Sequence, residues 1–174
     1  MYFEVIKMLE KIDHITIALN AGAYQAALAL ALTLPDICAK VDNKLSTTKS
    51  VHYIAWVDYY VDFNPLSPCG DTKKAEMNGT LIYSLRCSFL HCGNDEIKNQ
   101  VAAQNLPHTT FKVVPPNSLG DGNVYKYYIK NGSNNTAVIE TQIDAQAICK
   151  LLCVAAEKYY NAYTPKSDFD DYLL

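Results

Sequence analysis

The sequence has few charged residues, and basic residues do not outnumber acidic ones. Charged residues make up 19% of the chain, 15 Lys and Arg stand against 18 Asp and Glu, and the formal net charge is −3. A protein that binds nucleic acid non-specifically needs a strongly basic surface to neutralise the phosphates. The composition therefore excludes that class of function, and any contact with RNA has to be local.

The sequence also lacks the short motifs that hold phosphates, metals or acyl intermediates. It has no glycine-rich phosphate loop, no nucleophile elbow, no His-Glu-x-x-His zinc motif and no Cys-x-x-Cys knuckle. We therefore expect no cofactor and no bound metal.

No hydrophobic run is long enough to span a bilayer. The most apolar stretch, Ala21–Leu34, is rich in alanine and shorter than the roughly 20 residues that a transmembrane helix needs. The N-terminus carries Glu4 early and continues into Glu10 and Lys11, which does not fit a signal peptide. We therefore expect a cytoplasmic protein with no membrane partner.

The cysteines do not form a pattern that requires disulfide bonds. Reduced thiols are the default state in the cytoplasm, and a chain of this length does not need cross-links to fold. We expect the cysteines to pack as small hydrophobic side chains. There are six of them, at positions 38, 69, 87, 92, 149 and 153.

What the sequence does contain is hydrophobic and aromatic surface. Of its 174 residues, 49% are hydrophobic and 13 are Tyr. Tyrosines have an apolar ring and a hydroxyl that reaches water or a partner, so half-buried surface of this kind is typical of an interface. We predict a single domain, residues 1–174, that forms a homodimer.

The first half of the chain shows helical periodicity. Apolar residues recur every three or four positions, which is typical of amphipathic helices, and Gly93 is a natural terminator of the last one. A helical core over about residues 2–93 follows from this pattern. The predicted helices are Tyr2–Asn20, Ala23–Leu32, Leu34–Val41, one capped by Ser50, and one from Thr72 or Lys73 to His91.

The second half changes character. Short β-branched and aromatic runs alternate with Gly- and Asn-rich turns, which indicates a small antiparallel β-meander over about residues 109–140. A last amphipathic helix is predicted from Gln142 or Ile143 to about Tyr163, with Pro165 beyond its end. The predicted fold is a mainly α helical bundle with this meander inserted before the C-terminal helix.

Arg86 and His91 stand out in the otherwise apolar or small-residue run Leu81–Cys92. An unpaired charge in such a run is costly, so the Arg must be held by a carboxylate, by an interface or by a ligand. A His near neutral pKa can move a proton, and an always-charged Arg can hold a phosphate. At about 100° per residue the two lie roughly 140° apart on one helix, so they converge at a helix end or across a two-fold axis.

The segment Arg86–His91 resembles the R-x4-6-H signature of the HEPN superfamily. The flanking segments Ala31–Cys38 and Tyr53–Asp58 also resemble a family of small, uncharacterised bacterial proteins with this helical core. The resemblance covers about residues 20 to 95. It implies a HEPN-like helical, usually dimeric domain.

The resemblance also implies a function. Many HEPN proteins are metal-independent endoribonucleases, in which the residues that match Arg86 and His91 line a cleft at the dimer interface. The RNA 2′-hydroxyl then attacks its own phosphate, with the His as general acid or base and the Arg stabilising the phosphate. Active members often have a polar residue after the Arg, where this sequence has Cys87, and other members are inactive binding modules.

A structural role is the alternative for the same two residues. Arg86 can pair with Asp36 or Asp58 inside the bundle, and His91 can interact with the C-terminal end of its helix. The protein would then be a non-catalytic structural or regulatory interaction module. The sequence leaves both hypotheses open.

A zinc site is a more distant alternative. Cys149 and Cys153 lie four residues apart on one predicted helix, and Cys87 and His91 have the same spacing on another. Two helices could therefore present four zinc ligands. Helical cysteines without a short knuckle are more often core residues, so we expect no metal here.

Overall fold

The computed structural model describes residues 7–63, 77–92, 96–97, 109–120, 125–131 and 137–172. Helices dominate these residues, in agreement with the predicted mainly α fold. Among them, no helix is long and apolar enough to cross a membrane. The helices are α1 (Lys7–Asn20), α2 (Tyr24–Ala31), α3 (Leu34–Asn43), α4 (Ser50–Tyr60), α5 (Gly79–Cys92), α6 (Ala145–Ala162) and the 3-10 helix η4 (Lys166–Tyr172).

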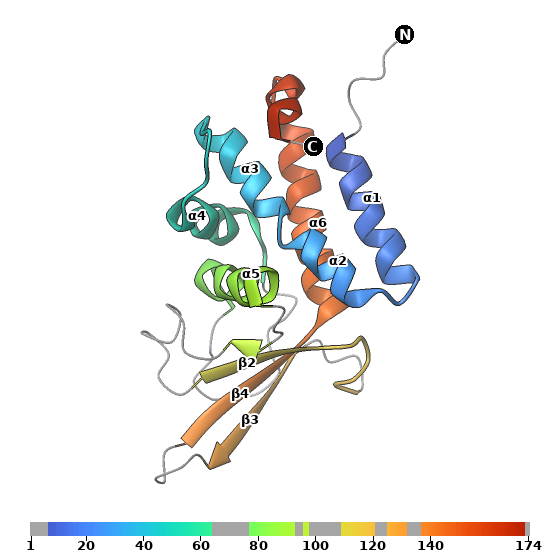
Figure 1. The fold of residues 1–174 in the computed structure, drawn as a ribbon, viewed down its shortest axis with the longest axis vertical. Coiled ribbons are helices and arrows are strands. Elements are labelled where there is room, and N and C mark those ends of the chain that lie inside the picture. The colour runs from blue at the N-terminus through green and yellow to red at the C-terminus, as the bar shows by residue number, and fades with distance from the viewer. Residues whose placement is uncertain are drawn as a thin grey trace.

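The helices pack around α6. Figure 1 shows α6 running lengthwise through the helical part, with α1 and α3 on either side of it and α2 near its start. Helices α4 and α5 lie side by side; α4 packs mainly against α3, and α5 also contacts α2. The large side chains at the centre have at most 1% of their surface exposed, and they include Ile15, Leu28, Leu34, Tyr53 and Leu152. Burial of these side chains stabilises the fold by about 1.5–3 kcal/mol each.

The predicted helix boundaries in the first half hold, with two corrections. Helix α4 begins at Ser50, but Lys49 occupies the cap position that Ser50 was expected to fill. Helix α5 begins at Gly79 and not near Thr72 or Lys73, because the Asn78 Oδ1 atom accepts a hydrogen bond from the Leu81 N–H at 3.0 Å and thereby starts the helix. The predicted residues 2–6 and 72–76 lie outside the described part of the chain.

Four strands form one mixed sheet at the end of the bundle where α6 begins (Figure 1). The strands are β1 (Glu96–Ile97), β2 (Thr109–Val114), β3 (Tyr125–Asn131) and β4 (Ala137–Asp144), in the order β1-β2-β4-β3. Strand β2 runs parallel to β4, whereas β1 is antiparallel to β2 and β3 is antiparallel to β4.

The predicted antiparallel meander is therefore wrong, although β2, β3 and β4 do form in the predicted part of the chain. In a meander β3 would lie between β2 and β4, but here β4 lies between the other two. Parallel neighbours need a crossover connection of about a dozen residues or more. The segment between β2 and β4, which contains β3, is long enough to supply it.

Strand β4 continues directly into α6. The predicted helix start at Gln142 or Ile143 is early, because both residues pair with β2, opposite Lys112 and Val113. The helix begins only after Asp144, whose Oδ1 atom accepts a hydrogen bond from the Ala147 N–H at 3.1 Å. This side chain satisfies one of the free N–H groups of the first helical turn and so marks the boundary between strand and helix.

Candidate functional site

Helix α5 carries both candidate residues and directs Arg86 into the bundle. The Arg86 Nε atom donates a hydrogen bond to the Asp36 Oδ2 atom on α3 at 2.6 Å. The two side chains keep only 22% and 19% of their surface exposed. Asp36 and Asp58 were the two expected partners of this Arg, and Asp36 is the one that contacts it.

Two tyrosine rings complete the surroundings of the Arg86 guanidinium. Its central carbon lies 5.8 Å from the ring centre of Tyr53 and 5.9 Å from that of Tyr83. The two rings meet edge to face, with centres 5.4 Å apart. Tyr53 is fixed in turn, because its hydroxyl donates to the Leu32 carbonyl oxygen at 3.1 Å. Arg86 thus has a carboxylate and two aromatic faces as neighbours, which together suit a partly buried cation.

Both charged groups of the pair are partly buried. Burial raises the pKa of the Asp36 carboxyl above its ordinary value, and the nearby Arg86 guanidinium opposes this rise. For Arg86 burial acts to lower the pKa, but the Asp36 carboxylate more than offsets it, so the guanidinium stays charged. Removing either partner would leave the other charge poorly solvated, so the two are expected to be coupled in stability.

Asp58, the other expected partner, has a different role. Its Oδ1 atom accepts a hydrogen bond from the Gly79 N–H at 2.5 Å, which fastens the start of α5 to α4. A carboxylate close to the first N–H groups of a helix is favourable because of the helix dipole. Asp58 therefore positions the helix that carries Arg86 and does not contact the guanidinium itself.

His91 lies in the last turn of α5 and is exposed. No hydrogen bond or ion pair joins it to another residue in the described part of the chain. Since five residues correspond to roughly 140° around the helix, His91 does not face the side of α5 where Arg86 meets Asp36. The structure therefore does not bring the two candidate catalytic side chains together within one chain.

Cys87 follows Arg86 and is half-buried with a free thiol. Burial and then a hydrogen bond with this thiol raise the pKa of the Tyr83 hydroxyl. The Cys87 thiol therefore lies beside Tyr83, one of the two tyrosines next to the Arg86 guanidinium.

The zinc alternative finds no support in the described residues. Cys149 and Cys153 are buried on α6, and burial raises the pKa of both thiols to about 12. A raised thiol pKa in apolar surroundings is typical of structural core cysteines. Nor do the described residues contain a group of three or more His, Cys, Asp or Glu side chains arranged to hold a metal. Together with Cys38, these cysteines pack as small core side chains, as expected.

A cavity of about 500 Å³ lies away from Arg86 and was not predicted from the sequence. Its walls come from the loop before α2, from α2 itself, from Phe89 on α5, from the end of β2 and from the first residue of α6. Sequence periodicity cannot reveal a cavity whose walls come from parts of the chain that are far apart in the sequence. The one available signal was the run of small residues Ala21-Gly22-Ala23, which leaves space beside the start of α2.

Comparison with known proteins adds no relative. No protein-family model matches the sequence, and no curated protein or solved structure matches it. Arg86, His91 and the cavity are therefore the features from which a function can be inferred.

Proposed function

We propose that this protein is a non-catalytic interaction module, in which Arg86 is a structural residue and His91 is an exposed side chain without a catalytic partner. The observation that supports the proposal best is the 2.6 Å contact between Arg86 Nε and Asp36 Oδ2. It joins α5 to α3, two helices that are far apart in the sequence. The guanidinium thus has a role in the fold without any ligand.

The same contact argues against phosphate binding by Arg86. A phosphate that approached the guanidinium would also approach the Asp36 carboxylate, and like charges repel. Phosphoryl-transfer catalysis depends on a cation that becomes more useful as charge develops in the transition state. A cation already neutralised by a carboxylate at 2.6 Å contributes less to that stabilisation.

The second candidate is the HEPN-type, metal-independent endoribonuclease. The observations in its favour are the R-x4-H spacing and the exposure of His91, which leaves its imidazole accessible to a second copy of the chain. In a homodimer, His91 of one copy could then approach Arg86 of the other. Both the dimer and the RNA contact remain predictions from the sequence.

An RNA cleavage assay separates the two candidates. Purified wild-type protein, Arg86→Ala and His91→Ala are incubated with mixed RNA in EDTA, and the unfolding temperature of each sample is measured. We expect no cleavage by any of the three, a fall of several degrees in Tm for Arg86→Ala and little change for His91→Ala. Cleavage by the wild type that is lost in both variants would overturn the proposal.

The oligomeric state is measured on the same wild-type sample. Sedimentation equilibrium that shows a monomer at micromolar concentration would remove the predicted homodimer and, with it, the arrangement that the nuclease candidate needs. A dimer would leave the RNA cleavage assay as the deciding result.

A further inference from the structure

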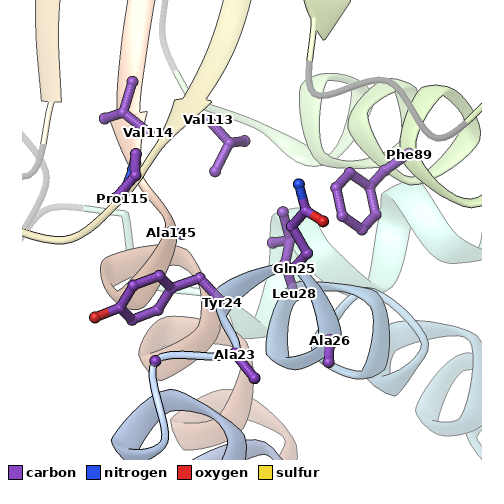
Figure 2. Close-up of a pocket in the computed structure, with 11 residues that line it drawn as sticks. Ala23, Tyr24, Gln25, Ala26, Leu28, Phe89, Val113, Val114, Pro115 and Ala145 are labelled. Carbon is purple, nitrogen blue, oxygen red and sulfur yellow. The ribbon is translucent and has the colours of Figure 1, made fainter.

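The cavity at the junction of helices and sheet has the size of a small-molecule site. Its volume of about 500 Å³ lies within the roughly 300–1,000 Å³ of typical ligand pockets. Figure 2 shows its residues converging from the start of α2, from α5 and from the end of β2. Neither Arg86 nor His91 lines it, so its use does not depend on the role of those residues.

The floor of the cavity is apolar, and most of the exposed residues that line it have small side chains. Leu28, Val113, Val114 and Ala145 line it and are each at most 8% exposed. At the rim, Gly22, Ala23, Ala26 and Pro115 are exposed and carry few side-chain atoms to close the opening. A ligand could therefore enter from solvent and reach an apolar floor without displacing a bulky side chain.

The walls are fixed by the fold before any ligand arrives. Strands β2 and β4 are parallel, and their carboxyl ends meet at the cavity, where Val114 lies opposite Asp144. The buried Asp144 carboxylate accepts hydrogen bonds from the Asn117 and Ala147 N–H groups, both at 3.1 Å. It thereby ties the turn after β2 to the start of α6. Ligand sites are usually preformed in this way, and they often lie at the carboxyl ends of parallel strands.

The residues that line the cavity indicate the charge and polarity of a ligand that would fit. None of the lining residues carries a charged side chain, so a charged group placed inside would lose water without gaining a partner. Figure 2 shows the Gln25 carboxamide pointing into the space between Phe89 and Val113, whereas the Tyr24 hydroxyl points away from it. A carboxamide both donates and accepts hydrogen bonds. The cavity therefore offers an apolar wall with an aromatic ring and one neutral polar group.

We propose that this cavity binds an uncharged, mainly apolar small molecule, of the size of two or three fused or linked rings, that carries one neutral hydrogen-bonding group. Phe89 contacts a ring of the ligand and Gln25 meets its polar group. Through Phe89, the ligand would touch the same helix that carries Arg86.

Two dyes that differ by one charge test the ligand class. N-phenyl-1-naphthylamine is neutral and fluoresces in apolar surroundings, and 8-anilino-1-naphthalenesulfonate has the same rings with a sulfonate added. We expect one saturable site for the neutral dye, with Kd in the micromolar range, and at least tenfold weaker binding of the sulfonate. Absence of saturable binding by the neutral dye, or equal affinity for both dyes, would overturn the proposal.

A matched pair of variants places the dye in the cavity. Gln25→Trp fills the space from an exposed position, and Asn161→Trp makes the corresponding change at the exposed far end of α6. We expect the affinity for the neutral dye to fall at least tenfold in Gln25→Trp and to change less than twofold in Asn161→Trp. Unchanged binding by Gln25→Trp would contradict the assignment. Should circular dichroism show that Gln25→Trp is unfolded, Gln25→Arg, which places a charge in the same space, decides the question by the same criterion.

Discussion

Arg86 Nε and Asp36 Oδ2 lie 2.6 Å apart and join α5 to α3 through two side chains that are about one-fifth exposed. The contact lies beside the buried Tyr53, which belongs to α4. Helices α3, α4 and α5 thus meet at this charged pair. This arrangement explains why a single Arg is tolerated in the otherwise apolar or small-residue face of α5 without invoking a ligand.

Gly79 marks a close approach between α4 and α5. A Cβ atom added at this position would lie 2.4 Å from the Ile54 carbonyl oxygen and 3.0 Å from Asp58 Oδ1. In the middle of a helix, replacing Gly by Ala stabilises a protein by about 0.5–1 kcal/mol, but Gly79 is the first residue of α5. We expect instead a loss of about 1–3 kcal/mol, because the backbone of α4 must move away. Urea unfolding measures the change, and a gain in stability would show that the two helices are less closely packed.

Asp144 is expected to stabilise both the start of α6 and the turn after β2. Its carboxylate accepts two backbone hydrogen bonds and is 6% exposed. Asp144→Ala should lower the free energy of unfolding by about 1–2 kcal/mol or more, since a cap and a second contact are lost. Asp144→Asn keeps one acceptor oxygen and should recover part of that loss. If the alanine variant unfolds at the same urea concentration as the wild type, the capping role is wrong.

Alkaline pH should destabilise the fold through Cys149 and Cys153. Burial raises the pKa of both thiols to about 12, whereas the pKa of a thiol in an unfolded chain is about 8.5. The folded chain therefore holds these protons more tightly. The resulting stabilisation is fully present below about pH 8.5 and is lost as the pH rises toward 12.

Urea unfolding in a reducing agent at pH 7.5 and pH 10.5 checks the alkaline effect. We expect the wild type to lose stability between these two values and the double variant Cys149→Ala/Cys153→Ala to lose less. Comparing the two losses removes the cost of the cavity that the alanines create, because that cost is present at both pH values. An equal loss in both proteins would mean that other groups, such as buried tyrosines, cause the effect.

The helices were predictable because each buries one face. Apolar residues such as Ile12, Ile15 and Leu19 recur at helical spacing and are all buried in α1. The start of α6 was also within reach, since Asp144 is a strong capping residue, but the apolar Ile143 just before it fits a strand as well as a helix. Periodicity alone could not choose between the two.

The sheet order and the partner of Arg86 could not be predicted from local sequence. Turn residues between β2, β3 and β4 indicate strands that reverse direction, but they do not say that β4 pairs with β2 in parallel. Likewise Asp36 and Asp58 each follow an apolar residue in a helix, so the local sequence does not distinguish them as partners of Arg86. Only the packing of α3 and α4 against α5 brings one carboxylate to the guanidinium and the other to the Gly79 N–H.

A double-mutant cycle on Arg86 and Asp36 tests most directly whether Arg86 is structural. The free energy of unfolding is measured for wild type, Arg86→Met, Asp36→Asn and the double variant, with the exposed His91→Ala as the control. We expect each single change to cost about 2–4 kcal/mol, because it leaves a partly buried charge unpaired, and the control to cost less than about 0.5 kcal/mol. The double variant should lose about 1–3 kcal/mol less than the sum of the single losses. Additive losses, or single changes no larger than that of the control, would contradict the structural role of Arg86.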